Sequence, residues 1–196
     1  MNMNIEESYI FEELTQLTVL KTSIFFPGDG FCVYDCMGNL VFRVESYGGL
    51  DVQDKDELIL MDFSGKCLLT VRRKRPSLHQ RWEGFLGERC EGQKPIFSVR
   101  RSSIIGRSSV TVDVVGDPGE EYQIDGSFGQ RCCTFYNSSK ETVAEIKRKV
   151  DASANVVLGK DVFSLWIKPG FNAAFAMALV LILDQISGDD GDDVDS

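Results

Sequence analysis

The run Phe171-Asn-Ala-Ala-Phe-Ala-Met-Ala-Leu-Val-Leu-Ile-Leu183 contains thirteen consecutive uncharged residues, nearly all of them apolar. At about 1.5 Å per residue, a helix of this length spans about 20 Å, which is shorter than the hydrocarbon core of a bilayer at about 30 Å. A helix that is apolar on every side has to be surrounded on every side, by lipid or by protein. Because the length argues against lipid, we expect a helix over residues 171–186 that is enclosed by protein.

The competing interpretation of this run is a tail-anchored membrane helix, which would make lipid scrambling a candidate activity. The run is short for a membrane span, and the charged residues Lys168 and Asp184 flank it closely. We therefore expect no transmembrane span.

The sequence before the helix predicts the enclosing wall, as a succession of short β-strands. Leu40, Phe42 and Val44 fall on one face of such a strand by the period-two rule. Turn residues such as Gly116-Asp-Pro-Gly119 separate the runs and favour antiparallel pairing through hairpins. The predicted strands are Thr18–Phe26, Gly30–Asp35, Leu40–Glu45, Glu57–Met61, Cys67–Arg73, Arg81–Leu86, Pro95–Arg100, Val110–Val115, Glu121–Gly126, Arg131–Tyr136, Thr142–Lys149 and Phe163–Lys168.

These strands predict a mainly β fold, an antiparallel barrel of about twelve strands that encloses the C-terminal helix. Such a barrel is wider than the eight-stranded kind whose own side chains fill the lumen, so the apolar helix would occupy the space. For residues 142–150 an amphipathic helix is the alternative to a strand. We expect a flexible acidic lead-in over residues 1–16, one barrel domain over 17–187 and a disordered tail over 188–196, whose last eight residues include five aspartates.

Few residues of the sequence indicate a targeting signal, a metal site or a catalytic site. The N-terminus lacks the basic and apolar regions of a signal peptide, so we expect a cytoplasmic protein, with the plasma-membrane surface and the nucleus as alternatives. The six cysteines lack the paired spacing of a metal site, and we expect reduced, mostly buried thiols, no metal and no cofactor. The only histidine, His79, is expected to have a structural role beside Trp82. No nucleophile–base pattern indicates an enzyme.

The charge of the chain is unevenly distributed. Residues 61–110 carry 11 basic and 4 acidic side chains, residues 1–60 carry 3 and 11, and residues 111–196 carry 7 and 15. A basic segment in an acidic chain suits an anionic partner, although the same charges could also disperse over solvated strand faces. Phosphate is the natural partner, because guanidinium groups bind its oxygens bidentately. The candidate anion-binding residues are Arg72, Arg73, Lys74, Arg75, Arg81, Arg100, Arg101 and Arg107.

Alternation along a strand limits how many of these residues can share one site. It would send Arg72 and Lys74 to one face of a strand and Arg73 to the other. We therefore expect only part of the basic segment to converge.

Seven stretches of the chain share a family pattern in the same order: Thr22–Asp35, Gly38–Val44, Leu69–Lys74, Ser77–Trp82, Val99–Ser102, Gly159–Ser164 and Ala174–Asp184. Together they resemble the plant LURP-one-related family over roughly Leu17 to Ile186. The resemblance implies the fold of the tubby C-terminal domain, a twelve-stranded barrel threaded by a hydrophobic C-terminal helix. It also implies kinship with tubby-like proteins and phospholipid scramblases, a superfamily linked to membrane tethering and transcription, and a link to plant defence. Phosphoinositide headgroups are the ligand that it favours, and it implies no catalytic residues.

We therefore expect a non-catalytic binding or scaffold protein whose partners are anionic lipid headgroups or other proteins. A nuclear protein that contacts DNA or transcription partners is one alternative, although the acidic net charge argues against tight DNA binding. An enzyme with a small-molecule substrate and an unknown reaction is the other.

Overall fold

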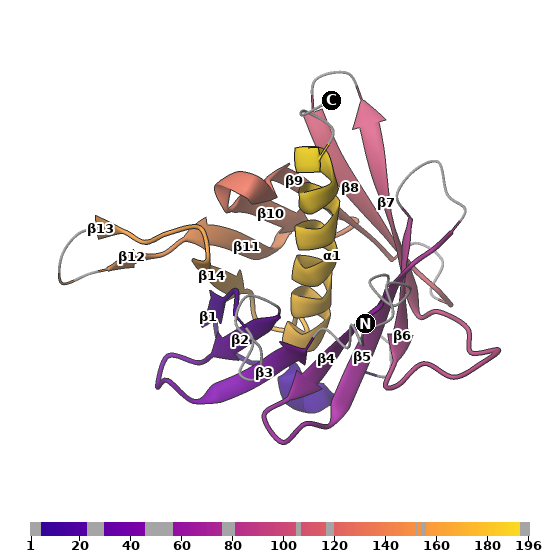
Figure 1. Ribbon diagram of the computed structural model, residues 1–196, viewed down its shortest axis with the longest axis horizontal. Coiled ribbons are helices and arrows are strands. Elements are labelled where there is room, and N and C mark those ends of the chain that lie inside the picture. The colour runs from indigo at the N-terminus through magenta and orange to yellow at the C-terminus, as the bar shows by residue number, and fades with distance from the viewer. Residues whose placement is uncertain are drawn as a thin grey trace.

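Twelve antiparallel strands close into one barrel around a single C-terminal helix (Figure 1). The computed structural model describes residues 5–22, 30–45, 57–75, 81–104, 107–116, 120–151, 153 and 156–192. Around the barrel the strands follow the order β1-β14-β11-β10-β9-β8-β7-β6-β5-β4-β3-β2. Their bounds are β1 (Thr15–Leu20), β2 (Phe31–Tyr34), β3 (Leu40–Glu45), β4 (Glu57–Asp62), β5 (Cys67–Arg73), β6 (Trp82–Leu86), β7 (Phe97–Ile104), β8 (Arg107–Val114), β9 (Glu121–Ser127), β10 (Cys132–Tyr136), β11 (Thr142–Arg148) and β14 (Val162–Ile167).

Three smaller elements and the helix complete the fold. The short strands β12 (Val150–Asp151) and β13 (Val156–Val157) pair as a separate hairpin, which projects from the barrel in Figure 1. The 3-10 turns are η1 (Glu7–Tyr9) and η2 (Phe128–Gln130), and the helix is α1 (Ala173–Asp192).

Tight turns explain why strands that follow each other in sequence pair in space. In the β2–β3 turn, Asp35 Oδ1 accepts hydrogen bonds from the backbone N–H groups of Met37 and Asn39, both at 2.8 Å. Gly38 completes this turn at a φ of +83°, a conformation that side chains disfavour. The β4–β5 turn repeats the arrangement with Asp62 as the acceptor.

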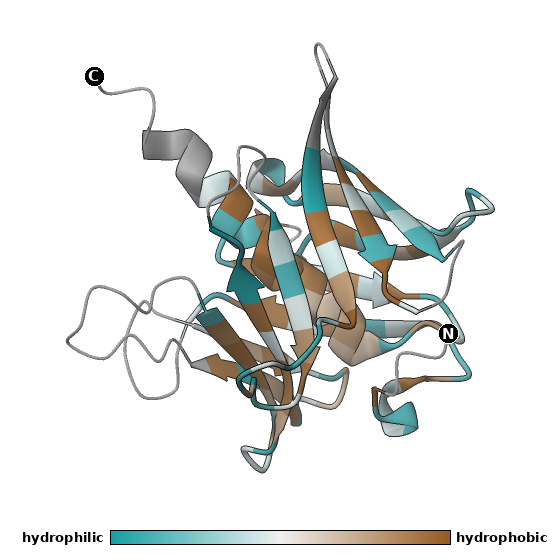
Figure 2. Cartoon of the chain, turned by 90° about the vertical axis from the view of Figure 1, so that its right-hand side faces the viewer, coloured by the Kyte–Doolittle hydropathy of each residue, from teal (hydrophilic) through white to brown (hydrophobic). Residues whose placement is uncertain are grey.

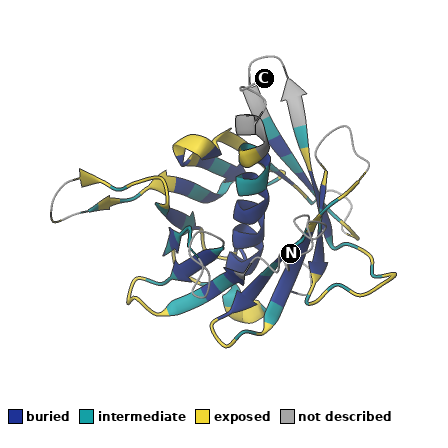
Figure 3. Cartoon of the chain, viewed as in Figure 1, coloured by how far each residue is buried: buried dark blue, intermediate teal, exposed yellow. Residues whose placement is uncertain are grey.

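Helix α1 runs through the barrel and fills its interior, as the dark blue helix in Figure 3 shows. Every residue from Ala173 to Ile182 is at most 1% exposed. Alanines let the wall approach closely, whereas the Phe175 ring lies 5.0 Å from that of Phe97 and 5.6 Å from that of Tyr122. In Figure 2, hydrophobic and hydrophilic residues alternate along several strands of the wall.

The burial of α1 decides between the two interpretations of the apolar run. The enclosed helix is confirmed, and the tail-anchored membrane helix is wrong, because residues 173–182 have no side left to face lipid. Within the part of the chain that the structure describes, no helix has the length and apolar character that a bilayer crossing requires.

Asn172 starts α1 and fastens the N-terminal segment to the barrel. Its Oδ1 accepts a hydrogen bond from the N–H of Phe175 at 3.0 Å, as an N-cap does, and its Nδ2 donates to the carbonyl of Glu6 at 3.1 Å. The N–H of Gly170 donates to the carbonyl of Phe11 at 3.0 Å. Residues 5–14 therefore pack across the end of the barrel at which α1 begins.

Most predicted strands agree with the structure to within a few residues. Leu40–Glu45 and Cys67–Arg73 have the predicted bounds. Residues 142–148 form strand β11 and not the alternative helix, because they pair with both β10 and β14. The predicted strand Thr18–Phe26 begins earlier, at Thr15, and its residues 23–26 lie outside the described residues.

The two ends of the chain differ from the sequence-based expectation. Residues 15 and 16 belong to β1, and residues 5–14 pack on the barrel where a flexible lead-in was expected. Helix α1 continues to Asp192, so the first part of the expected disordered tail is helical, and residues 193–196 lie outside the described residues.

All six cysteines are free thiols, but only Cys32 and Cys133 are buried. The expectation of mostly buried cysteines is therefore wrong. Cys36 and Cys90 lie outside the strands, and Cys132 is exposed on β10 next to the buried Cys133, because successive side chains of a strand face opposite ways.

This distribution predicts how many thiols react in the folded protein. Burial raises the pKa of the Cys133 thiol to about 12, so this thiol is both inaccessible and un-ionised near neutral pH. We expect a water-soluble disulfide reagent to modify the three exposed cysteines rapidly, and Cys32 and Cys133 only after unfolding. Mass spectrometry of the modified peptides checks this, and rapid native labelling of Cys133 would contradict the burial of β10.

The enclosure of α1 predicts the effect of one charge at its centre. Ala176→Glu would place a carboxylate at a fully buried position without a partner, at a cost of several kcal/mol against a total stability of about 5–15 kcal/mol. We expect the variant to lose its cooperative thermal transition, measured by circular dichroism. Gln185→Glu, at a half-buried position of the same helix, is the control and should fold normally. A folded Ala176→Glu variant would contradict the central position of α1.

Candidate anion-binding site

The outer face of the barrel brings together three of the predicted basic residues. The backbone N–H of Lys74 donates to the carbonyl of Arg81 at 2.8 Å, which extends the β5–β6 ladder by one residue pair. Trp82 pairs with Val99, so Arg81 and Arg100 are neighbours across β6 and β7. Lys74 follows the end of β5, Arg81 precedes the start of β6 and Arg100 lies on β7, so the three residues form a line across the outer face, which we call the basic row. All three residues are exposed.

A second line of outward-facing residues lies directly beside the basic row and is mostly acidic. It follows the pairings Glu57–Arg72, Arg72–Glu83, Glu83–Ser98 and Ser98–Asp113 across β4 to β8. Arg72, one of the predicted site residues, therefore lies between two carboxylates. The carboxylates of this second line therefore lie beside the cations of the basic row.

The contacts between the two lines are single and exposed to solvent. Lys74 Nζ lies 2.7 Å from Glu83 Oε1, and Arg100 Nη2 lies 3.5 Å from Asp113 Oδ1, while the two cationic side chains are 48% and 56% exposed. Arg81 Nη2 donates to Ser98 Oγ at 3.3 Å. Exposed ion pairs contribute at most about 1 kcal/mol each, so a multivalent anion could replace them.

The remaining basic residues are placed differently. Arg73 pairs with the buried Trp82 and shares its inward face, and Arg75 is exposed beyond the end of β5. Arg101 follows the buried Val99 by two residues of β7 and lines a cavity beside α1. Arg107 begins β8, and its side chain lies outside the described residues. The expectation that only part of the segment converges is thus met for Lys74, Arg81 and Arg100.

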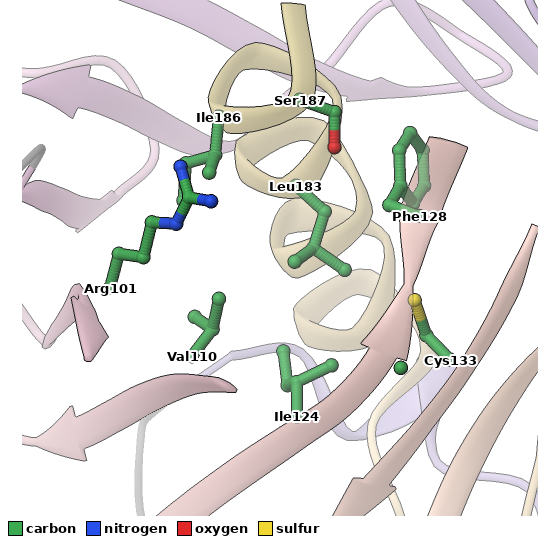
Figure 4. Close-up of a pocket in the computed structure, with 9 residues that line it drawn as sticks. Arg101, Val110, Ile124, Phe128, Cys133, Leu183, Ile186 and Ser187 are labelled. Atoms are coloured by element: carbon green, nitrogen blue, oxygen red, sulfur yellow. The ribbon is translucent and has the colours of Figure 1, made fainter. Parts of the chain in front are cut away.

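The inward-facing Arg101 lines a small cavity where α1 leaves the barrel (Figure 4). Leu183, Ile186 and Ser187 of α1 form one side, and the cavity volume is about 40 Å³. This space suits a few water molecules, whereas sites for small molecules typically measure about 300–1,000 Å³. The other lining residues are Val110, Ile124, Gly126, Phe128 and Cys133.

Arg131 makes several close contacts that the sequence pattern does not predict. Its guanidinium lies 4.1 Å from the ring centroid of Phe128 and 4.6 Å from that of Phe163, and its Nε donates to the carbonyl of Lys160 at 2.8 Å. Burial lowers the pKa of this guanidinium, and the nearby carboxylate of Asp184 on α1 opposes the shift. A guanidinium is a cation at any pH of interest, so Arg131 joins η2, β14 and α1 as a structural charge.

Loss of this side chain should destabilise the fold. Arg131→Ala would remove two cation–π contacts and leave the carbonyl of Lys160 without this donor, at a cost of about 2–4 kcal/mol. We expect a lower midpoint of urea unfolding than in wild type. Arg148→Ala, which removes an exposed arginine of β11, is the matched control and should leave the midpoint unchanged. Equal midpoints for both variants would contradict the structural role.

The described residues contain no group of three or more histidine, cysteine, aspartate or glutamate side chains that could hold a metal ion. His79 lies outside the described residues, so its expected contact with the buried Trp82 stays a prediction. The site that the geometry defines is therefore the basic row.

The fold and this surface define a class of proteins: twelve-stranded antiparallel barrels built around a C-terminal helix. Comparison with known proteins identifies the branch, since residues 15–184 match the sequence model of the LURP-one-related family. The chain belongs to this family, as the sequence resemblance predicts. The Arabidopsis thaliana protein LURP-one-related 12 is 66% identical over 186 residues, with 95% of this chain and 84% of the relative covered. LURP-one-related 5 of the same plant is also 66% identical, over 188 residues that cover 95% and 90% of the two chains.

A solved structure independently supports the fold. The X-ray structure of another Arabidopsis thaliana protein superposes with a TM-score of 0.68 over 93% of this chain and 96% of that chain. The sequence identity is 23%, so this likeness concerns the fold alone.

Proposed function

We propose that this chain is a non-catalytic binding domain whose basic row binds phosphorylated headgroups, with phosphoinositides at a membrane surface as the ligand class. The observation that carries the proposal is the alignment of Lys74, directly after β5, Arg81, directly before β6, and Arg100 of β7. Neighbouring strands lie about 4.8 Å apart, so adjacent cations of the row can reach one phosphate or two phosphates of one ring. The two arginines add bidentate hydrogen bonds to phosphate oxygens.

The surroundings of the row favour a small polyanion over a long one. The adjacent line carries Glu57, Glu83 and Asp113, and the whole chain has a net charge of −9. Duplex DNA would have to cover acidic surface beyond the row, whereas a headgroup needs to touch only the row. The charge pattern therefore supports the lipid proposal over the DNA-binding alternative.

Family membership supports a role as a binding or scaffold protein. The resemblance of the sequence to a superfamily linked to membrane tethering is consistent with a surface that recognises lipid headgroups. A role in plant defence is a proposal at the level of the family, and it would place headgroup binding upstream of a signalling response.

A vesicle co-sedimentation assay tests the proposal. We expect the chain to bind phosphatidylcholine vesicles that contain phosphatidylinositol bisphosphate, and to bind them more weakly as salt is added. The double variant Arg81→Gln/Arg100→Gln should bind at least about ten-fold more weakly, since each charge-assisted hydrogen bond contributes about 1.5–3 kcal/mol. The matched control is Lys94→Gln/Lys168→Gln, which removes two exposed cations at the opposite end of the barrel.

Two results would contradict the proposal. One is equal binding to vesicles of pure phosphatidylcholine, and the other is unchanged binding by the double variant. Steeply salt-dependent retention on duplex DNA that exceeds vesicle binding would favour the nuclear alternative instead.

A further inference from the structure

Among the residues that the structure describes, the exposed large apolar side chains fall into two groups at opposite ends of the barrel. Exposed apolar side chains that gather in one place mark surfaces that suit a partner. The group at the end where α1 begins contains Leu14, Met37, Phe63, Leu86 and Val115. The group at the other end belongs to the hairpin β12–β13 and contains Val150, Val156 and Val157.

The hairpin projects from the barrel and presents its valines on both faces (Figure 1). Its strands form a separate sheet of two, in which Val150 pairs with Val157 and Asp151 with Val156. Val150 and Val157 therefore share one face, and Val156 lies on the other. A hairpin of two strands is marginally stable by itself in water, so contact with a partner would stabilise it.

The base of the hairpin is positively charged. Residues 147–161 include four basic and two acidic side chains. Of the two acids, Asp151 is engaged within the hairpin, where its Oδ1 accepts hydrogen bonds from the backbone N–H and the Oγ of Ser153 at 2.8 and 2.6 Å. Arg148 and Lys160 flank the two strands and are exposed. We call β12, β13 and these two flanking cations the valine arm.

At the opposite end of the barrel, three of the exposed apolar residues are close to one another. Leu14 directly precedes β1, which pairs with β2, and Met37 lies in the turn that follows β2. Phe63 lies in the next turn of this end, because Phe42 of β3 pairs with Asp62 of β4. Met37 is 81% exposed and Phe63 is 68% exposed. The tips of two neighbouring hairpins are thus apolar.

Carboxylates surround these apolar tips. The segment 5–14, which packs across this end, contains four glutamates and no basic side chain. One of them, Glu6, pairs with Lys66 of the β4–β5 turn, and the other three are exposed. An apolar centre with an acidic rim suits a partner that is apolar and basic. We call this surface the acidic patch, which consists of Leu14, Met37, Phe63, Glu7, Glu12 and Glu13.

We propose that the valine arm of one copy of this chain docks on the acidic patch of a second copy. The arm is apolar and basic, and the patch is apolar and acidic, so the two surfaces are complementary in both respects. An anionic membrane would suit the arm but not the patch, whereas a second copy suits both. This inference does not use the basic row and is independent of the proposed lipid binding.

One chain cannot make this contact with itself. The arm leaves the barrel between the end of β11 and the start of β14, and the six residues of β14 separate it from the patch by about 20 Å. The arm also points away from the barrel in Figure 1. The contact is therefore head-to-tail, and such contacts build rings or open chains of copies.

The size of the arm predicts a weak association. A contact made by one short hairpin buries less than the roughly 1,600 Å² of a standard interface. In sedimentation experiments at low salt, we expect the weight-average mass of the wild-type chain to rise at least about two-fold between about 5 μM and 500 μM protein. Added salt should reduce this rise, because it screens the charges that face each other.

Two variants, each with one surface removed, test the head-to-tail arrangement. The arm variant is Val156→Ser/Val157→Ser, and the patch variant is Met37→Ser/Phe63→Ser. All four positions are exposed, so both variants should fold, which circular dichroism checks. Each variant alone should stay monomeric at 500 μM. Their equimolar mixture should form a dimer and nothing larger, because the arm of one variant and the patch of the other are intact.

The matched control is Val115→Ser, which removes an exposed valine of the same end outside the patch. It should associate like wild type, as should Arg81→Gln/Arg100→Gln of the basic row. Loss of lipid binding together with intact association in this second variant would separate the two proposals.

Four results would overturn the inference. They are a wild-type chain that stays monomeric over the whole range, an arm variant that associates like wild type, a mixture that stays monomeric, and an equal loss of association in Val115→Ser. If the wild-type chain stays monomeric and the arm variant binds vesicles more weakly than wild type, the arm contacts the membrane instead.

Discussion

The structure depends on one constraint, which is that a helix apolar on all sides has to be enclosed. Residues 173–182 are almost completely buried, and no one strand or sheet face could bury them alone. A closed sheet of twelve strands meets the requirement, because its lumen is wide enough for a helix and its closure removes exposed strand edges. The alanines of α1 allow close approach of the wall, and Phe175 fills the remaining space against Phe97 and Tyr122.

Because α1 fills the interior of the barrel, we expect binding sites on the outer face and at the ends of the barrel. The cavity beside Arg101 measures about 40 Å³, so the described interior offers little room for a ligand there. Strand alternation then determines which charges meet. It directs Arg73 and Arg101 toward the end of the barrel and leaves Lys74, Arg81 and Arg100 on the outer face. The proposed binding of headgroups follows from this division of one basic segment.

The fold could be predicted from the sequence because its determinants are local or strongly periodic. The apolar run indicates a helix that is buried on every side. The alternation in Leu40–Glu45 indicates a strand with one apolar and one more polar face. The hairpin β12–β13 could not be predicted, since strands of two residues carry no period. The predicted end of α1 differs from the observed one because Gly188 and the aspartates that follow it have low helix propensity. Exposed cysteines were missed because the residue type favours burial, and position on a turn or an outer face decides otherwise.

The candidate site was predictable only in part, for the same reason. Composition indicates the basic segment, but the acidic residues beside the basic row are brought there by the pairing of strands β4 to β8. Arg131 appeared as the first residue of a strand, and only the packing of Phe128 and Phe163 around it shows that it is structural. Register between distant strands thus decides which charges act together.

Native-state hydrogen exchange of the backbone amides tests the enclosed helix most directly. If the barrel has to open before α1 meets water, the amides of residues 176–183 should exchange only through global unfolding, with the same free energy as the slowest amides of β5 and β14. Exchange of these helix amides at a clearly lower free energy than the strands would contradict the enclosure on which the whole account depends.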